Sequence, residues 1–235
     1  PKDKVFLPKI QKYDLKDVPK HGHYGIRKQW HKWLVENNQW REAVRGYLAS
    51  ISFADAQVGR LIDALDKSPH AKNTIIVLWS DHGMHIGEKQ QWEKFTLFEE
   101  STRVPLIIVA PGITKPGTIC DKPVNLLDVY PTLNELCNLP ARKDLDGISL
   151  VKLLKKPKIK WERPSITTWG KGNHAARGQR YRYIRHPNGE EQLYDHKTDP
   201  NEFTNLADNP ELASVKKQLA KWLPKTNANA VRNKQ

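Results

Sequence analysis

Two short, uninterrupted apolar runs constrain the fold of this chain more than any other feature of its sequence. They occupy residues 74–79 (TIIVLW) and 104–109 (VPLIIV), and both are rich in β-branched side chains. A short run without polar alternation is typical of a strand that is buried on both faces of its sheet. Such a strand needs a layer on each side, so these runs favour an α/β architecture.

Amphipathic patterns flank the two runs. Apolar side chains recur at three- and four-residue steps through residues 47–65 and again through residues 125–138. This spacing places them on one face of an α-helix. Helices that alternate with buried strands in this way predict a mostly parallel sheet flanked by helices.

The last third of the chain has a different pattern, with short alternating runs in place of long ones. These runs occupy residues 165–169, 181–185 and 192–194. Asn188-Gly189 lies between the last two and is a strong hairpin signal. We therefore expect a small antiparallel sheet here, followed by one amphipathic helix over residues 210–223.

The change of pattern falls close to Pro157 and predicts a division of the chain into two parts. We expect residues 1–155 to belong to a main α/β domain. Residues 156–235 are then expected to form a small α+β subdomain that contains the antiparallel sheet and the last helix.

The chain is strongly basic, with 39 Lys and Arg against 26 Asp and Glu and a formal net charge of +13. Such a balance favours an anionic partner, for example a sulfated polysaccharide, although a solvated basic surface without a ligand is the alternative. The cations are spread along the chain and their runs lack interleaved aromatic residues, so we expect no nucleic-acid partner. No apolar run approaches the roughly 18 residues of a membrane span, so we expect no membrane partner.

An acid and an imidazole, Asp81 and His82, stand just beyond the first apolar run. In open α/β sheets, ligands bind beyond the carboxyl ends of the strands. A carboxylate and an imidazole are suitable metal ligands, and Gly83 lets the backbone turn sharply beside an ion. The alternative is that Asp81 caps the following turn and that His82 is a polar residue with local partners.

Lys94 follows twelve residues after His82 and lies between the aromatic residues Trp92 and Phe95. Its ammonium group could deliver one positive charge to an anion that is bound at the metal. A solvated surface lysine with its stem against Trp92 is the alternative.

Four segments of the chain resemble the type I sulfatases, the formylglycine-dependent family, and they occur in that family's order and spacing. They are YLASISFADAQVGRLIDAL (47–65), TIIVLWSDHGMHIGEKQQWEKFTLFEESTRVPLIIVAPG (74–112), VNLLDVYPTLNELCNL (124–139) and LYDHKTDPNEFTNLADNPE (193–211). Together they cover most of residues 41–223, and the nearest branch is the iduronate-2-sulfatase-like group. The resemblance implies an alkaline-phosphatase-like α/β fold, of which this chain forms the C-terminal part.

The resemblance also implies roles for five residues. Asp81 and His82 stand where the family places ligands of its active-site divalent cation, usually calcium, with magnesium or zinc as alternatives. Because calcium prefers oxygen ligands, His82 would bind it more weakly than Asp81 or would mainly contact the sulfate. Lys94 stands where the family places a lysine that contacts the sulfate group. His174 and Arg177 lie in a region that lines the substrate pocket, with a position on a hairpin surface as the alternative for both.

The chain departs from the family pattern at several places. Lys89-Gln90 stands where many relatives have a His-Gly pair. The nucleophile of the family is a formylglycine made from a C/S-x-P-x-R motif, and neither Cys120 nor Cys137 has the proline and arginine of that motif. The acidic pair that completes the family's metal site is also absent. We therefore expect both features in an N-terminal portion of the same enzyme, and no catalysis by this chain alone.

These features predict a sulfatase, a sulfuric ester hydrolase that acts on a sulfated polysaccharide or glycosaminoglycan, with uronate 2-sulfates among its candidate substrates. The resemblance implies a periplasmic, secreted or lysosomal location. One alternative is a metal-dependent phosphodiesterase of the alkaline phosphatase superfamily, in which Asp81 and His82 would both bind zinc. The segments 92–94 and 193–211 favour a sulfatase instead. The other alternative is a non-catalytic sulfoglycan-binding relative that has lost the nucleophile.

Overall fold

The computed structural model describes residues 2–228, and its N-terminal part is helical. The elements are η1 (Lys2–Lys4), η2 (Lys20–His23), α1 (Lys28–Glu36) and α2 (Trp40–Asp66). α2 confirms the helix that was predicted over residues 47–65 and begins about two turns earlier. In its first turns, the fully buried Val44 packs against Ile86 and Trp92.

From Ile51 onward, α2 presents several apolar side chains to solvent. Ile51, Phe53 and Leu61 are exposed, the last two by about 70%. Ile62 and Leu65, near the end of the helix, are half-buried, so the described residues cover only part of the apolar stripe that the sequence predicts. No helix in the described part of the chain has both the length and the apolar character needed to cross a bilayer.

The two apolar runs form strands, as predicted, and the strands pair with each other. They are β1 (Ile76–Trp79) and β4 (Leu106–Val109), and Ile76 lies opposite Val109 in an antiparallel ladder. This corrects the expectation of a mostly parallel sheet for the strands within residues 2–228, where every pair is antiparallel. A parallel pair needs a long crossover, and the segment between β1 and β4 contains no helix longer than one turn.

The segment around and between β1 and β4 is built from short elements. They are η3 (Ala71–Asn73), β2 (His85–Ile86), η4 (Glu88–Gln90), β3 (Trp92–Glu93) and α3 (Glu99–Thr102). β2 and β3 form a small antiparallel hairpin, with Ile86 opposite Trp92. Trp40 of α2 donates from Nε1 to the Ile86 carbonyl at 2.7 Å, which ties this hairpin to the long helix.

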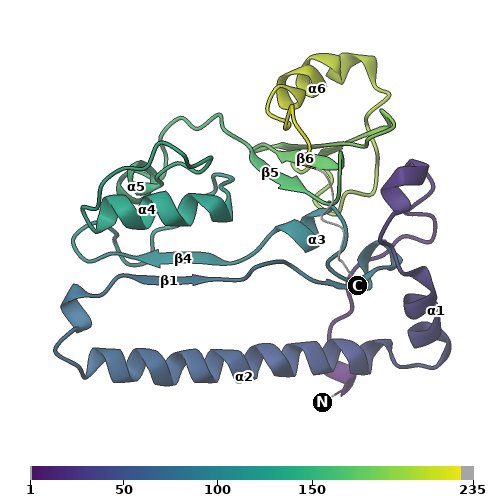
Figure 1. Cartoon of the computed structure of the whole chain (residues 1–235). Coiled ribbons are helices and arrows are strands. Elements are labelled where there is room, and N and C mark those ends of the chain that lie inside the picture. The colour runs from purple at the N-terminus through teal and green to yellow at the C-terminus, as the bar shows by residue number, and fades with distance from the viewer. Residues whose placement is uncertain (1, 229–235) are drawn as a thin grey trace, which may run out of the picture.

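Helices lie on both sides of the β1–β4 ribbon. The predicted helix over residues 125–138 is present as η5 (Leu126–Asp128) and α4 (Val129–Leu136), and α5 (Val151–Lys155) follows. Figure 1 shows α2 on one side of the ribbon and α4 and α5 on the other. The layered α/β arrangement is therefore confirmed. The strands are not buried on both faces, however, since Ile107 and Val109 are half exposed.

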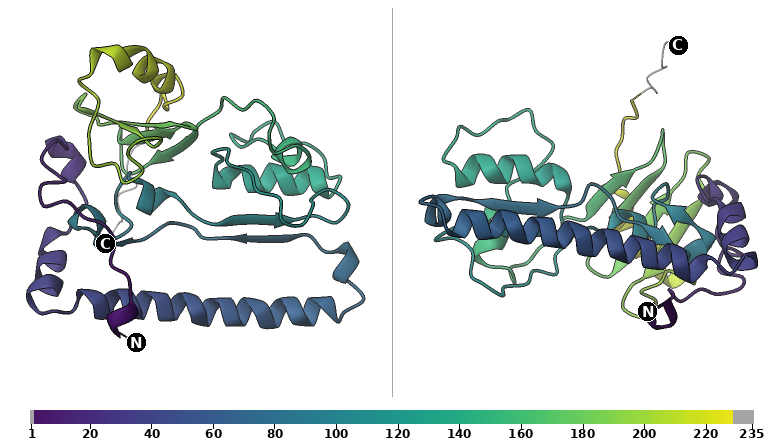
Figure 2. Two further views of the ribbon diagram at one scale, coloured as in Figure 1. Left: turned by 180° about the vertical axis from the view of Figure 1, so that it is seen from behind. Right: turned by 90° about the horizontal axis from the view of Figure 1, so that it is seen from below.

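The last third of the chain forms the predicted antiparallel sheet and helix. The elements are β5 (Ser165–Thr168), β6 (His174–Arg177), β7 (Tyr181–Arg185), β8 (Glu191–Asp195), η6 (Pro210–Leu212) and α6 (Ala213–Ala220). The strands pair in chain order, and the Asn188-Gly189 turn joins β7 to β8, as predicted. Figure 2 shows α6 over one face of this sheet, with the N-terminal segment beside it.

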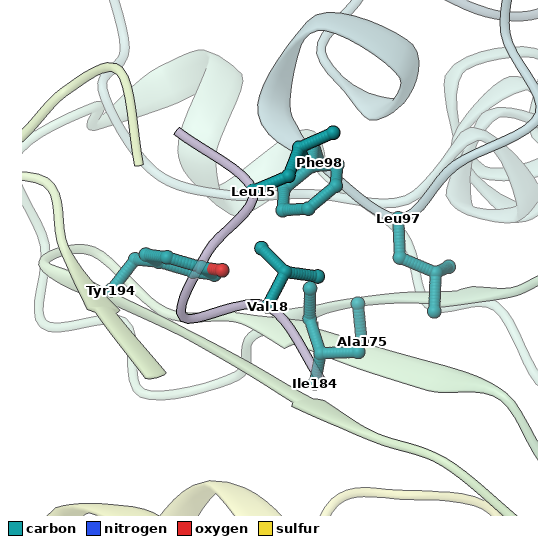
Figure 3. Packing of buried hydrophobic residues seen from close by; sticks show 7 residues of the cluster. All are labelled: Leu15, Val18, Leu97, Phe98, Ala175, Ile184 and Tyr194. Carbon is teal, nitrogen blue, oxygen red and sulfur yellow. The ribbon is translucent and has the colours of Figure 1, made fainter. Parts of the chain in front are cut away.

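Both faces of the four-stranded sheet are buried, because neighbouring residues of a strand point to opposite sides. Tyr183 and Leu193 face the cluster that contains α6, whereas Ile184 and Tyr194 face a second cluster. Figure 3 shows this second cluster: Leu15, Val18, Leu97, Phe98, Ala175, Ile184 and Tyr194. The N-terminal segment and the residues before α3 therefore pack directly on the C-terminal sheet. The domain division at residue 155 stays a prediction.

Candidate functional site

Asp81 and His82 lie in the loop that leaves β1. The His82 backbone N–H donates to Asp81 Oδ1 at 3.1 Å, a contact between adjacent residues and not the contact two residues on that caps a turn. His82 Nδ1 lies 2.7 Å from the carbonyl O of Gly83, and because a carbonyl can only accept, Nδ1 carries a proton; in the neutral ring Nε2 then has the lone pair. Nε2 is 3.7 Å from Asp81 Oδ1, and the Asp81 side chain is 75% exposed. The pair thus offers a carboxylate oxygen and an imidazole lone pair side by side, two donors that suit a divalent cation.

Gly83 fixes this loop against α3. Its backbone N–H donates to the Ser101 carbonyl at 2.9 Å. A Cβ at this position would lie 1.9 Å from the carbonyl O of Glu100, a distance that no side chain tolerates. The close approach of two backbones therefore requires glycine here, and it sets the position of the two residues before it.

The β2–β3 hairpin carries Lys94 to the same region. His85 of β2 is fully buried and its Nε2 lies 2.8 Å from Thr96 Oγ1, which in turn lies 2.8 Å from Ser101 Oγ of α3. Burial lowers the pKa of His85 to about 3, so this ring is neutral and structural. The chain between the hairpin and α3 is held firmly on both sides of Lys94.

Lys94 is half-buried, and its Nζ lies 5.5 Å from the centre of the Phe95 ring. Within residues 2–228 no carboxylate forms an ion pair with it. The aromatic neighbour differs from the expected one, since Trp92 is buried in the cluster with Val44 and Ile86. An ammonium group without a counter-ion is free to bind an anionic ligand.

One cavity brings most of the predicted site residues together. Its volume is about 1190 Å³, and Asp81, His82, Lys94 and Arg177 are among its lining residues. Arg177 is largely buried: its Nε donates to Glu99 at 3.1 Å and its Nη2 lies 3.1 Å from His196 Nδ1. Arg177 therefore lies on the wall of the cavity and not on the surface of a hairpin.

His174 does not line this cavity. It is 3% exposed, and its two ring nitrogens lie 2.8 Å from Thr168 Oγ1 and 2.8 Å from Asn227 Oδ1. Burial lowers its pKa, with the Asn227 hydrogen bond opposing that effect. A substrate contact by His174 stays a prediction, and it requires that one of these two hydrogen bonds be given up.

A buried ionic network, which the sequence did not reveal, supports the wall that contains Arg177. Arg182 of β7 donates to Glu202 Oε1 at 2.6 Å and also to Glu99, and His196 Nε2 lies 2.8 Å from Glu202. Burial raises the pKa of Glu202, but Arg182 and His196 outweigh it and bring that pKa to about 2. Glu202 lies within segment 193–211, where the family resemblance gave no residue a role.

Three members of this network, Glu99, His196 and Glu202, have ligand atoms within 4.8 Å of one another. Arg182 and Arg177 already supply the charge that balances the two carboxylates. A divalent cation would face two guanidinium groups at this place, so we assign no metal to the triad.

The departure at Lys89 has a structural explanation. Lys89 Nζ donates to Asp14 Oδ1 at 2.6 Å, and both side chains are almost fully buried. The ammonium group is also surrounded by the rings of Phe98, Tyr194 and Phe203 at 5.0, 5.7 and 5.4 Å. This ion pair attaches the N-terminal segment to the loop between β2 and β3.

Comparison with known protein families shows the family to which this chain belongs. The family model described as Sulfatase matches residues 9–139. The chain belongs to the sulfatase family. A second model, described as N-sulphoglucosamine sulphohydrolase, C-terminal, matches residues 87–229. The loop after β1 and Lys94 lie in the first range, and β6 lies in the second.

Curated relatives are also sulfatases. This sulfatase chain is 41% identical to "Sulfatase" of Formosa agariphila over 97% of the chain and 45% of the relative. It is 38% identical to "Choline-sulfatase" of Rhizobium meliloti over 72% of the chain and 34% of the relative. It is 30% identical to "Delta 4,5-hexuronate-2-O-sulfatase" of Bacteroides thetaiotaomicron over 79% of the chain and 42% of the relative. The chain thus spans less than half the length of these relatives.

Solved structures confirm the fold. A 2-O GAG sulfatase superposes with a TM-score of 0.76 at 25% identity, over 92% of this chain and 51% of that one. A structure in complex with its substrate D-glucosamine-2-N,6-O-disulfate gives a TM-score of 0.67 at 28% identity, over 78% and 40%. Phosphonate monoester hydrolase of Agrobacterium radiobacter gives 0.65 at 27% identity, over 78% and 40%. The predicted sulfatase fold is confirmed, and it is shared with an enzyme that acts on phosphorus.

Proposed function

We propose that this chain forms one wall of the active site of a sulfatase, which hydrolyses sulfate esters of a sulfated carbohydrate. The observation that carries the proposal is the convergence of an acid–imidazole pair, Asp81 and His82, and an ammonium group, Lys94, on one cavity. A cation site beside an unpaired positive charge suits a tetrahedral oxyanion. The names of the relatives support sulfate as that oxyanion.

Asp81 and His82 are proposed to hold a divalent cation. The exposed carboxylate of Asp81 suits calcium, a hard cation that takes oxygen ligands, and magnesium or zinc are the alternatives. When bound, the cation supplies positive charge that neutralises sulfate oxygens in the transition state. The Nδ1–H···O bond to Gly83 orients the His82 ring and leaves Nε2 as the nitrogen that would bind the ion or contact the sulfate.

Lys94 is proposed to bind the sulfate group as a catalytic residue. Its three N–H donors can contact sulfate oxygens, and its position between the hairpin and α3 keeps it in place during the reaction. The nucleophile is proposed to be a formylglycine in an N-terminal portion of the same enzyme. Cys120 and Cys137 cannot supply it because neither lies in a C/S-x-P-x-R motif.

The substrate is proposed to be a sulfated glycosaminoglycan or related polysaccharide, with uronate 2-sulfates as candidates. A relative named for hexuronate 2-O-sulfate and a structure described as a 2-O GAG sulfatase support this class. Arg177 and His174 are proposed substrate contacts, Arg177 from the cavity wall and His174 after release of a hydrogen bond. Such an enzyme is proposed to act in the periplasm, in the lysosome or outside the cell.

A phosphorus substrate is the second candidate. The phosphonate monoester hydrolase shares the fold, and the free Nε2 of His82 suits zinc as a ligand. Stoichiometric zinc without calcium in the purified enzyme would favour this candidate over a sulfatase. The third candidate is a sulfoglycan-binding relative without catalysis. The absence of any turnover by the complete enzyme would favour it.

The proposal is tested with the complete enzyme, in which this chain is joined by or co-expressed with the N-terminal portion. Lys94→Ala should lower kcat for sulfate release by about 100- to 1000-fold, as expected when one charged donor to an oxyanion is lost. Lys72→Ala, in the exposed η3, is the matched control and should leave the rate unchanged. Wild-type turnover by Lys94→Ala would refute the role of this residue, and turnover of a phosphodiester but no sulfate ester would refute the sulfatase reading.

A further inference from the structure

Aromatic side chains from three distant segments meet beside Lys94. Tyr24 precedes α1, Phe95 follows β3, and Trp169 follows β5. The Tyr24 and Phe95 rings each make an edge-to-face contact with Trp169, with ring centroids 4.8 and 5.9 Å apart. Trp30 of α1 joins the group through Arg27, which contacts both the Trp30 and the Phe95 ring.

Positive charges are interleaved with these rings. The Arg27 guanidinium lies 4.8 Å from the centre of the Trp30 ring and 5.4 Å from that of Phe95. Lys94 lies on Phe95 as well, at 5.5 Å. Glu93 pairs with Arg27 at 3.1 Å and keeps the guanidinium in this position. The fold therefore brings the cations and aromatic rings of residues 24–30 together with those of residues 94–95.

The backbone that carries these groups is fixed by buried contacts. Gln91 is fully buried, donates from Nε2 to the Gly25 carbonyl at 3.0 Å, and accepts from the Arg27 backbone N–H at 2.6 Å. Gly25 has φ +89°, and a Cβ there would lie 2.1 Å from the Phe95 carbonyl O. The N-terminal segment is thus locked onto the loop of Lys94, and the rings are held before any ligand binds.

The surface is accessible and continuous with the candidate site. Tyr24 is 66% exposed and Trp30 is 45% exposed. Trp169 lines the same cavity as Lys94, and its buried Nε1 has no hydrogen-bond partner among the described residues. Exposed Trp and Tyr next to Arg are the composition of surfaces that bind ligands, since rigid rings offer large contact areas at low entropic cost.

We propose that Tyr24, Arg27, Trp30, Phe95 and Trp169 form a saccharide-binding platform, which holds further sugar units of a sulfated chain beside the unit whose sulfate meets Lys94. The inference rests on the proposed function and adds a binding surface for sugar units beyond the one whose sulfate is removed. The apolar C–H faces of the sugars pack on the rings. Their sulfate or carboxylate groups accept hydrogen bonds from the Arg27 guanidinium.

The platform is tested by fluorescence titration of the 235-residue chain, at low protein concentration, with a heparin-derived tetrasaccharide. Tyr24→Ala and Trp30→Ala should each weaken binding about tenfold, as expected for the loss of one stacking ring. Trp33→Ala is the matched control, because Trp33 lies on the same helix, is 56% exposed and makes none of the platform's ring contacts. The chemically desulfated tetrasaccharide should bind much more weakly than the sulfated one. Unchanged affinity of both platform variants, or an equal loss with Trp33→Ala, would overturn the proposal.

Kinetics of the complete enzyme separate this inference from the proposed function. Tyr24→Ala should raise KM for the tetrasaccharide about tenfold and leave the turnover of a small aryl sulfate unchanged. If the complete enzyme releases sulfate and the platform variants change neither tetrasaccharide affinity nor KM, the platform is overturned and the proposed function stands. If tetrasaccharide binding depends on Tyr24 and Trp30 but the complete enzyme releases no sulfate, the proposed sulfatase activity is overturned and the platform stands. Loss of assembly with the N-terminal portion in these variants would show that protein covers this surface, and it would also overturn the platform.

Discussion

Replacement of Gly83 by alanine is the sharpest test of how the candidate metal ligands are positioned. The new Cβ would lie 1.9 Å from the Glu100 carbonyl O and 2.9 Å from that of Arg103, where ordinary contacts begin near 3.4 Å. Both obstacles are backbone atoms in a densely packed region, so the loop and α3 must separate by about 1.5 Å. The shift also breaks the 2.9 Å hydrogen bond between Gly83 N and the Ser101 carbonyl.

The expected cost follows from these two effects. Overpacking contributes about 1–3 kcal/mol and the lost hydrogen bond about 1 kcal/mol, so the free energy of unfolding should fall by about 2–4 kcal/mol. Because Asp81 and His82 directly precede the displaced glycine, their positions shift by a similar distance. A misplacement of about 1 Å lowers turnover of the complete enzyme by about 100-fold.

Urea unfolding of the 235-residue chain, followed by tryptophan fluorescence, measures the loss of stability. Calcium titration measures the effect of displacing Asp81 and His82. Gly59→Ala is the matched control: it adds the same methyl group to an exposed helical position of α2 where no atom lies within 4 Å. That change should stabilise the chain by about 0.5–1 kcal/mol. If Gly83→Ala unfolds within about 0.5 kcal/mol of the parent and binds calcium equally well, the reasoning is refuted.

Two further predictions concern buried ionisable groups. Asp14→Ala leaves the Lys89 ammonium buried without its carboxylate and should lower the free energy of unfolding in urea by about 3–5 kcal/mol. Glu36→Ala, at an exposed helical ion pair, should lower it by about 0.5 kcal/mol at most, and equal decreases for the two variants would contradict the burial argument. The pKa of His85 is lowered by burial from 6.5 to about 3, so between these values the unfolded chain binds a proton that the folded chain does not. Stability should therefore fall as the pH drops below 6.5, with His85 contributing up to about 1.4 kcal/mol per pH unit. His85→Gln should flatten that decline in unfolding midpoints measured from pH 7 to 5, and an unchanged slope would show that other groups cause it.

The helices and strands of this chain could be predicted from the sequence, but the direction of strand pairing could not. Apolar spacing is a local property, and it located α2, α4, β1 and β4 correctly. Whether β4 returns parallel or antiparallel depends on the path of the segment between the strands, and the short elements there leave no strong periodic pattern. The alternating runs near Asn188-Gly189 were more informative, since a two-residue turn fixes an antiparallel pair.

The candidate site could likewise be predicted only in part from the sequence. The position of Asp81 at a strand end and the family resemblance were enough to select the loop and Lys94. The buried network was not predictable, because Arg182 and Glu202 each read as an ordinary polar residue until the sheet brings them together. Lys89 and Asp14 are 75 residues apart, and nothing local distinguishes a buried lysine in a loop from a solvated one.

The open ribbon of β1 and β4 has a practical consequence for every experiment on the isolated chain. Among residues 2–228 these strands pair only with each other, so the outer edge of each carries backbone N–H and C=O groups without ladder partners. Trp79 and Ile107 add half-exposed apolar side chains to the same ribbon. Such an edge is a template for strand addition by another molecule, and we expect the 235-residue chain to aggregate as its concentration rises. Binding and unfolding measurements therefore belong at low protein concentration, with light scattering as a check on the monomer.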